Sequence, residues 1–356
     1  MIELRKWGEL PGGEPVMLAT LADGHGVEVR VSSYGASLVS IRVPDRAGLV
    51  EDVLLGFDTL AGYLDPALQA GWPYLGSTIG RYANRIADAR FTIDGQEHRL
   101  AANEGDNQLH GGPIGFDRVA WQVELLNDGP GVRLYHISPD GDQGFPGRVE
   151  AQADFLLDAP GELVIRYAAI TDRPTHVSMA SHPYFNLAGR RSRSIAQHRL
   201  TVAAEAILPI DATAIPLPGP SMPVVGTPFD LREGRMIGAL IQADHPQLRT
   251  GDGLNHCFVL DPSASLAARL EHPQSGRCLD LVTTEPGLQI YSANGFDGSL
   301  HDGEGRPFVR RQAIALEAQR FPDSPNRPDL PPTLLRPGET YRSETRMRFS
   351  SGHADL

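Results

Sequence analysis

The stretch YRSETRMRF, residues 341–349, decides the fold class of this chain. Its odd-numbered positions, Tyr341 to Phe349, are uncharged, whereas every position between them is an arginine or a glutamate. A period of two is typical of a β-strand with one face buried and the other in water. The sequence therefore predicts a long, half-buried strand here.

The same period recurs along the whole chain. It is clear in residues 27–31, 119–125 and 149–155, while helical periodicity is scarce. Asp94-Gly95 stands between two short strand-like runs and tolerates the positive φ angles of a type I′ turn, which predicts a hairpin over residues 91–100. The pattern therefore predicts an all-β fold, a sandwich or a barrel.

The connections between these strands contain few helices. Short helical turns are expected at residues 59–64 and 234–241, and long ordered loops at 207–228 and 321–337, where glycine and proline are densest. No flexible linker and no repeat of fixed period interrupts the chain. We therefore expect residues 1–356 to form a single domain.

Composition restricts the function classes. The 356 residues include 44 acidic and 32 basic side chains, a net charge of -12, which argues against nucleic acid or an anionic membrane as a partner. Cys257 and Cys278 lie in apolar stretches without paired spacing, so we expect buried, reduced thiols. Residues 1–14 lack the apolar core of a secretory signal, and no apolar run reaches membrane-spanning length. These features predict a soluble, cytoplasmic protein.

Common chemical motifs are missing. The closest histidines, His176 and His182, have five residues between them and no Cys or Asp partners nearby, so no metal site is predicted. Neither a phosphate-binding glycine loop nor the Gly-x-Ser-x-Gly elbow of serine hydrolases occurs.

Four clusters mix polar side chains with glycine, proline or aromatic residues: 80–86 (GRYANRI), 107–112 (NQLHGG), 181–187 (SHPYFNL) and 313–318 (AIALEA). Each also has a structural interpretation, as a surface turn, a structural histidine or core aromatic residues. In the fourth, Glu317 shares a strand face with the small Ala313 and Ala315, opposite Ile314 and Leu316, which leaves room for a ligand beside the carboxylate.

In this order, the clusters resemble the aldose 1-epimerase (galactose mutarotase) family. Further matching motifs cover the chain from about Val27 to Phe349: YGASL (34–38), VPDR (43–46), LGFD (55–58) and the run from Glu317 to Asn326. The resemblance implies a large, twisted antiparallel β-sandwich of the galactose mutarotase type. It further implies a sugar on the concave face and no cofactor or obligatory metal.

The resemblance also assigns roles to residues. It makes His182 the acid and Glu317 the base, with Arg81, Asn84 and His110 as sugar ligands. Opening a pyranose requires a proton to leave the anomeric hydroxyl while another reaches the ring oxygen. An imidazole with a pKa of roughly 6.5 and a carboxylate of roughly 4.3 suit these tasks near neutrality. The expected function is therefore interconversion of the α and β anomers of a free aldose, an isomerase reaction.

Two positions depart from the family pattern. Where Asp usually precedes His256, this chain has Asn255, which can donate as well as accept a hydrogen bond to a sugar hydroxyl. Ser181 replaces the Asn that commonly precedes the histidine. We expect Asn255 to bind substrate with altered sugar preference rather than lost catalysis.

Three alternatives stay open: a non-catalytic sugar-binding or sensing protein, a mutarotase for hexose 6-phosphates, and a metal-dependent lyase or isomerase. The partner expected is a small monosaccharide, and the chain is expected to be a monomer or homodimer. The sequence leaves open whether galactose, glucose, arabinose, xylose or a deoxy sugar is preferred.

Overall fold

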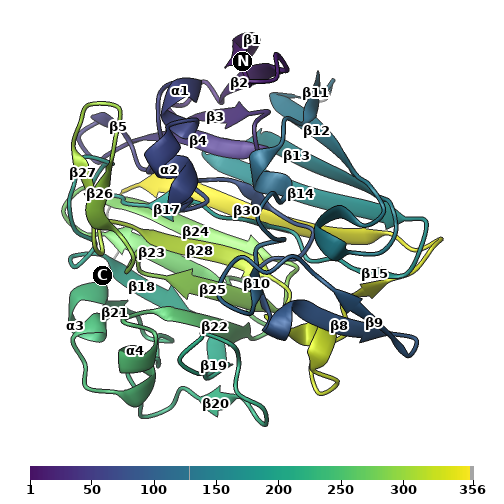
Figure 1. The fold of residues 1–356 in the computed structure, drawn as a ribbon. Coiled ribbons are helices and arrows are strands. Elements are labelled where there is room, and N and C mark those ends of the chain that lie inside the picture. Colours follow the sequence, from purple (N-terminus) through teal and green to yellow (C-terminus); the bar gives the residue numbers. More distant parts are fainter. Residues whose placement is uncertain (128, 353–356) are drawn as a thin grey trace.

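The fold is known from a computed structural model that describes residues 1–127 and 129–352. It contains antiparallel sheets of nine, six and five strands, together with several two-stranded pairs (Figure 1). The nine-stranded and six-stranded sheets share one hydrophobic core. This arrangement confirms the prediction of a large antiparallel β-sandwich.

The quoted stretch lies in β30 (Tyr341–Ser351), in the middle of the nine-stranded sheet. In spatial order this sheet contains β11 (Gln122–Leu125), β12 (Gly131–Ser138), β13 (Val149–Ala159), β14 (Glu162–Thr171), β30, β24 (Arg277–Thr283), β23 (Ala268–His272), β18 (Arg199–Val202) and β21 (Arg235–Met236). Met347 and Phe349 point into the core, whereas Arg342 and Arg348 are exposed, as the alternation predicts.

The six-stranded sheet covers the opposite side of that core. Its order is β17 (Tyr184–Phe185), β28 (Ile314–Gln319), β25 (Gly287–Tyr291), β22 (Asn255–Leu260), β19 (Ala204–Ile207) and β20 (Met222–Pro223). Ile314 and Leu316 of β28 belong to this core, whereas Ala313 and Ala315 belong to a second hydrophobic cluster. Glu317 therefore faces away from the core between the sheets, as its strand parity predicts.

The remaining elements surround these sheets. The five-stranded sheet runs β1 (Ile2–Glu9), β2 (Pro15–Ala22), β3 (Glu28–Ser32), β4 (Ser37–Pro44) and β5 (Val50–Asp52). The pairs are β6 (Thr78–Ile79) with β16 (Ala180–Ser181), β7 (Arg85–Ile86) with β10 (Gln108–Leu109), β8 (Arg90–Ile93) with β9 (Gln96–Arg99), β15 (Thr175–His176) with β29 (Leu334–Leu335), and β26 (Asp297–His301) with β27 (Pro307–Val309). The helices are α1 (Leu60–Tyr63), α2 (Pro66–Ala70), α3 (Ile237–Ile241) and α4 (Pro246–Thr250), with 3-10 turns at Ala87–Ala89, Phe116–Arg118, Asp142–Gly144 and Ser324–Asn326.

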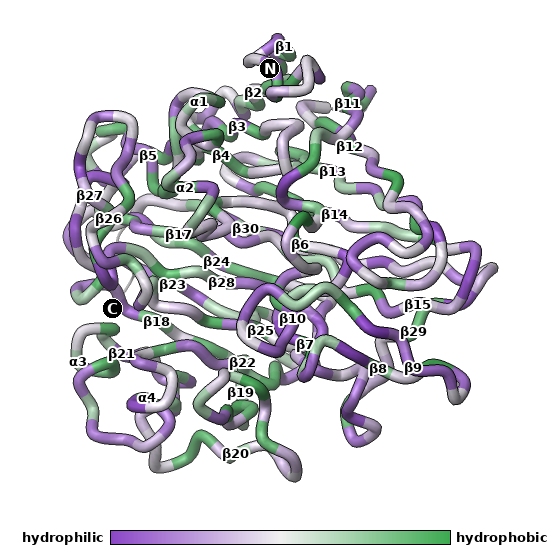
Figure 2. The backbone as a smooth tube through the Cα atoms, viewed as in Figure 1, coloured by the Kyte–Doolittle hydropathy of each residue, from purple (hydrophilic) through white to green (hydrophobic). Residues whose placement is uncertain are grey.

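Most local predictions are confirmed. The alternating runs 27–31 and 149–155 lie in β3 and β13, and α1 and α3 lie in the two stretches where helical turns were expected. Asp94 and Gly95 have φ angles of 50° and 84° and close the hairpin between β8 and β9. The two long loops contain only short elements. Hydrophobic and hydrophilic residues are mixed along both the strands and the connections (Figure 2).

One predicted strand is too long, and one cysteine is less buried than expected. Within 119–125 only β11 joins the sheet, because the Trp121 N–H donates to Ser33 O (2.8 Å) in the loop after β3. Both cysteines are free, but Cys278 is only half-buried whereas Cys257 is buried.

No helix among the described residues is long and apolar enough to cross a membrane.

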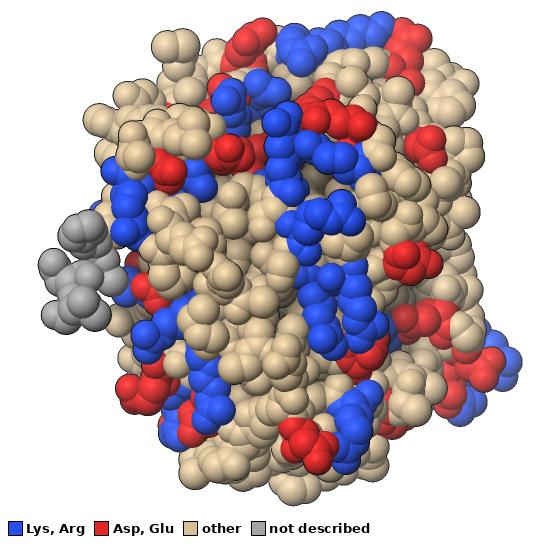
Figure 3. All heavy atoms as spheres, turned by 90° about the vertical axis from the view of Figure 1, so that its left-hand side faces the viewer, with Lys and Arg blue, Asp and Glu red and all other residues tan. Residues whose placement is uncertain are grey.

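Charges of both signs are mixed over the surface despite the net negative charge. On the face drawn in Figure 3, a band of Lys and Arg runs down the molecule with Asp and Glu beside it. Many of the arginines are paired with carboxylates within 4 Å, for example Arg191 with Glu304 (2.8 Å). Exposed pairs of this kind contribute little stability, because water screens them.

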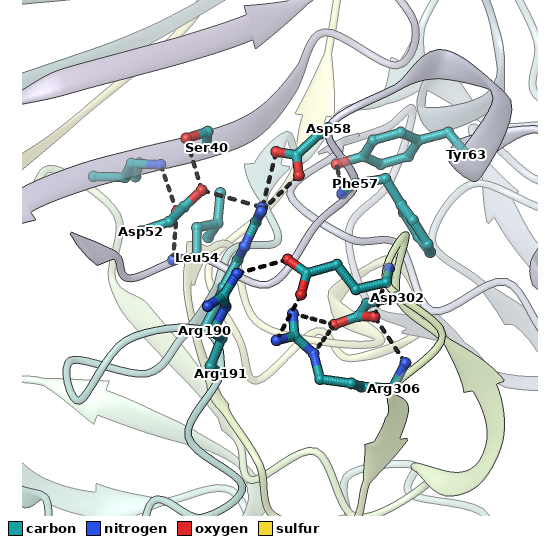
Figure 4. A network of polar contacts seen from close by, with 12 residues as sticks. Ser40, Asp52, Leu54, Phe57, Asp58, Tyr63, Arg190, Arg191, Asp302 and Arg306 are labelled. Atoms are coloured by element: carbon teal, nitrogen blue, oxygen red, sulfur yellow. Dashed lines mark hydrogen bonds and ion pairs between the residues drawn. The ribbon is translucent and has the colours of Figure 1, made fainter.

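One ionic network is partly buried and ties two sheets together (Figure 4). The guanidinium of Arg190 lies between the carboxylates of Asp52 (3.4 Å) and Asp58 (2.6 Å). Asp52 also accepts hydrogen bonds from Ser40 Oγ and from the Leu54 N–H. Because the next residue, Leu55, donates its N–H to the Tyr184 carbonyl (2.9 Å), the network fixes the segment after β5 against β17.

We predict that Arg190→Ala lowers the free energy of unfolding by about 2–4 kcal/mol, because it leaves the Asp52 carboxylate buried without its cation. Urea denaturation measures this loss. Arg191→Ala is the matched control, since the Arg191–Glu304 pair is exposed and its loss should cost less than about 1 kcal/mol. Equal losses in the two variants would contradict a special role for the buried pair.

Candidate active site

A cavity of about 250 Å³ opens on the face of the six-stranded sheet that points away from the core between the sheets. Neighbouring strands supply its floor, because Tyr184 and Tyr291 both pair with Ala315, and Gln289 pairs with Glu317. Asn255 of β22 extends the same row opposite Tyr291. The antiparallel register thus gathers side chains that are far apart in the sequence onto one surface.

His182 and Glu317 meet at the bottom of this cavity. The distance from His182 Nε2 to Glu317 Oε1 is 3.4 Å, and both side chains are at least 96% buried. Among the described residues, neither Glu317 Oε2 nor His182 Nδ1 has a hydrogen-bond partner. Buried polar atoms are rarely left unpaired, so these free positions indicate a place for a polar ligand.

Burial shifts the pKa values of the two groups in opposite directions. Loss of water lowers the pKa of His182 to about 4 and raises the pKa of Glu317 to about 8, against a smaller opposing effect of the Arg85 charge. Between these values the pair holds one proton in total. The two groups are close enough for the charge of one to affect the protonation of the other, so their titrations are coupled.

His110 lies beside this pair with its ring in a fixed tautomer. The backbone N–H of Asn84 donates to the ring atom Nδ1 of His110 (3.1 Å). The backbone N–H of His110 donates to the Asn84 carbonyl (3.0 Å). A neutral ring that accepts at Nδ1 carries its proton on Nε2 and can donate there. The following Gly111 has a φ of 88°, and a Cβ would lie 2.0 Å from Gly80 O, so this close backbone approach requires glycine.

Ligand atoms of His110, His182 and Glu317 lie within 4.8 Å of one another, a distance compatible with a metal ion. The hydrogen bonding around them does not fit one. A histidine that binds metal through one ring nitrogen normally donates its other N–H to a neighbour. His110 Nδ1 instead accepts from a backbone N–H, so its Nε2 is protonated and is a donor rather than a metal ligand.

Asn255, at the position where the family pattern has Asp, lies in the cavity lining. Its Oδ1 accepts a hydrogen bond from Gln289 Nε2 (2.9 Å). The adjacent His256 fixes the backbone, because His256 Nδ1 accepts the Asn255 N–H (3.2 Å) and its Nε2 contacts Gln247 Oε1 (3.1 Å). With Oδ1 occupied, the amide Nδ2 is the group that Asn255 can offer to a ligand as a donor.

The structure does not bring Arg81 to the cavity. Its side chain is buried, and its guanidinium donates to Ser138 Oγ and to the carbonyls of Pro139, Pro146 and Gly147. Arg85, four residues later in the same cluster, lines the cavity and forms a two-pronged ion pair with Glu104. Arg85 rather than the predicted Arg81 is thus the arginine that lines the cavity, because the cluster alone does not show which one faces it.

The other residues that the sequence predicts for the site lie at the cavity. Asn84, His110, His182, Asn255 and Glu317 all line the cavity. Sequence reasoning missed several lining residues, namely Trp72, Tyr74, Arg85, Gln289, Tyr291 and Phe296. In β25, Gln289 and Tyr291 alternate with the core residues Leu288 and Ile290, a signal that becomes useful only once the pairing with β28 is known.

Comparisons with known protein families, sequences and structures all identify the same protein family. A family model described as aldose 1-epimerase matches residues 17–348. The chain is 42% identical over 346 residues to a galactose mutarotase from Mus musculus, covering 97% of each sequence. It is 40% identical over 344 residues to an aldose 1-epimerase from Escherichia coli K12, covering 95% of this chain and 96% of the relative. A crystal structure of galactose 1-epimerase from Lactobacillus acidophilus has a TM-score of 0.86 with 28% identity, covering 99% of both chains.

The raised pKa of Glu317 predicts that this residue destabilises the fold at high pH. A carboxyl whose pKa is higher in the folded than in the unfolded state favours folding of the protonated form, so stability falls as pH rises from about 4.5 to about 8. We expect Glu317→Gln to be more stable than wild type by a few kcal/mol at pH 9 and by much less at pH 5. Thermal unfolding at both pH values measures the difference, and a constant gap would contradict it.

Proposed function

The chain belongs to the aldose 1-epimerase family and interconverts the α and β anomers of an aldose, and we propose that His182 and Glu317 carry out its proton transfers. The observation that supports these roles is the 3.4 Å approach of His182 Nε2 to Glu317 Oε1 inside a buried cavity. Two groups that hold one proton between them supply the donor and the acceptor that ring opening needs.

In the proposed mechanism, Glu317 is the base and His182 is the acid. Glu317 takes the proton from the anomeric hydroxyl, His182 gives its proton to the ring oxygen, and the bond from C1 to the ring oxygen breaks. After rotation about the C1–C2 bond, both transfers run in reverse and the ring closes on the other face. His182 and Glu317 together hold one proton before and after each transfer pair. No proton therefore has to enter or leave the site during turnover.

The resting pair favours the proton on Glu317, because burial opposes both charges. This is the same total protonation state as the reactive imidazolium and carboxylate. Hydrogen bonds donated by sugar hydroxyls to Glu317 stabilise its carboxylate and favour movement of the proton to His182, which lies 3.4 Å away. The cavity therefore stores the catalytic proton without keeping two separated charges in a dry site.

We propose that donors around the cavity hold the sugar hydroxyls. These donors are His110 Nε2, the amide groups of Asn84 and Asn255, and the Arg85 guanidinium. Aromatic rings of Trp72 and Phe296 offer apolar surface for the C–H groups of the sugar. The relatives named galactose mutarotase make galactose the first substrate to test.

A free sugar fits the cavity better than a hexose 6-phosphate. Among the described residues that line it, Arg85 is the only lysine or arginine, and Glu104 neutralises it. A phosphate would need an unpaired cation. Sugar binding measured by calorimetry without acceleration of mutarotation would instead indicate a non-catalytic sugar-binding protein.

We also propose that residues 1–356 form one cytoplasmic domain that acts as a monomer or homodimer. The continuous match to the family over residues 17–348 supports a single domain, as does a core cluster with members from Ala19 to Phe349. The free thiols of Cys257 and Cys278 suit a reducing compartment. Light scattering and limited proteolysis test the assembly and the domain organisation.

We predict that Glu317→Gln and His182→Asn each lower the rate of catalysed mutarotation by at least about a hundredfold, because each removes one partner of the proton transfer. Polarimetry of fresh α-galactose and α-glucose measures the rate. His176→Asn is the matched control, since His176 is also buried but bonds Thr333 Oγ1 (2.9 Å) away from the cavity lining. Near-normal rates in both site variants would refute the assignment.

The shared proton predicts a bell-shaped dependence of kcat/KM on pH. Below about pH 4 both groups are protonated and no base remains, and above about pH 8 the pair has no proton to donate. We expect a maximum near pH 6 after subtraction of the spontaneous rate. A rate that rises steadily through pH 9 would show that the pair does not need its proton.

A further inference from the structure

Tyr74 lies in the turn between α2 and β6 and has an unusual backbone conformation. Its φ of 59° is in the left-handed region, which is uncommon for a bulky residue that is not glycine. Such a conformation persists only where the surrounding contacts over-determine it, and it often marks functional sites. The backbone conformation of Tyr74 therefore indicates that its contacts have a role in the site.

The turn that carries Tyr74 is bonded directly to the backbone of His182. The Gly76 N–H donates to the His182 carbonyl (2.9 Å), and the His182 N–H donates to the Ser77 carbonyl (2.9 Å). The Ser77 N–H in turn donates to the Tyr74 carbonyl (3.1 Å). This close packing requires glycine at position 76, because a Cβ there would lie 1.8 Å from Leu38 O. Backbone hydrogen bonds thus link the turn that carries Tyr74 to His182.

The ring of Tyr74 contacts both cavity histidines. It is stacked on His182, with centroids 5.9 Å apart and planes at 27°, and meets the edge of His110 at 4.6 Å. His182 also contacts Tyr184 at 4.8 Å. The phenol oxygen of Tyr74 forms no hydrogen bond with the described part of the chain, so the ring rather than the hydroxyl makes these contacts.

We propose that Tyr74 is a positioning residue for the reaction: its ring holds the imidazole of His182 toward Glu317 and shields it from water. This inference rests on the roles proposed above for His182 and Glu317. The groups that face His182 are Glu317 from β28, His110 from the loop after β10, Tyr184 from β17 and Tyr74 itself. None of these is a fixed cation beside the imidazole, so exclusion of water has the largest effect on its protonation.

The same ring also favours the charged intermediate. When His182 holds the proton, the electron-rich face of a stacked phenol attracts the imidazolium. The ring thus keeps His182 neutral at rest by excluding water, yet offers an attractive face to the brief imidazolium. Phenylalanine would supply the same face, whereas leucine would not.

The test compares Tyr74→Leu with Tyr74→Phe in two measurements: kcat and KM by polarimetry, and the pKa of the His182 imidazole by NMR titration. For Tyr74→Leu we expect kcat to fall about tenfold and the His182 pKa to rise by about one pH unit toward its usual 6.5, because water reaches the ring. For Tyr74→Phe we expect both values to stay within about twofold and about 0.3 pH unit of wild type.

Phe296→Leu is the matched control, because Phe296 lines the cavity and contacts Tyr184 and Phe308 but neither histidine. It should raise KM and leave the His182 pKa unchanged. If Tyr74→Leu does not fold, as judged by circular dichroism, Tyr74→Met replaces it.

Two results would overturn the proposal: an unchanged His182 pKa in Tyr74→Leu with kcat within twofold of wild type, or equal losses in Tyr74→Phe and Tyr74→Leu. The second would assign the effect to the phenol oxygen. Failure of the roles proposed for His182 and Glu317 is a separate outcome. In that case Glu317→Gln and His182→Asn would keep their activity, whatever the NMR titration of Tyr74→Leu shows.

Discussion

The site depends on the burial of one carboxylate, that of Glu317, on a strand whose other face supplies the hydrophobic core. Ile314 and Leu316 pack between the two large sheets, and this packing holds β28 in place. The burial of Glu317 has an unfavourable free energy of desolvation. The hydrophobic core, which is far larger than the site, offsets it. Burial disfavours the charged form of this carboxyl, and His182 lies beside it as the partner for its proton in the proposed mechanism.

Around this pair the protein uses backbone groups more than side chains to hold the chemistry in place. The Asn84 N–H fixes the tautomer of His110, and the turn at Gly76 and Ser77 clamps the backbone of His182. These contacts require positive φ angles at Asn84, His110 and Gly111. The glycine and asparagine residues of the sequence clusters therefore allow the backbone conformation of the site. In the proposed mechanism, only a few side chains take part in proton transfer.

The sequence predicts what depends on local periodicity and motif order. Alternation identifies β30, β13 and the orientation of Glu317, and Asp94-Gly95 identifies a hairpin, because these depend on neighbours along the chain. The run 119–125 is wrong in its first half, because the Trp121 N–H finds its acceptor in the loop after β3. The placement of Arg85 at the cavity and of Arg81 away from it is missed for the same reason, since the direction of a side chain in a loop is set by distant groups such as Ser138 and Glu104. Tyr74 and Gln289 join the site only through tertiary pairing, which periodicity does not reveal.

The central place of β30 in the nine-stranded sheet has a consequence for how the chain is made. Its partners are β14, about 180 residues earlier, and β24, so Tyr341–Ser351 joins two halves of the sheet that are translated long before it. Pairings this distant in sequence close slowly, and their unpaired edges are exposed until they do. Until residues 341–351 have been synthesised, the edges of β14 and β24 that pair with β30 have no partner strand, and unpaired edges of this kind favour aggregation.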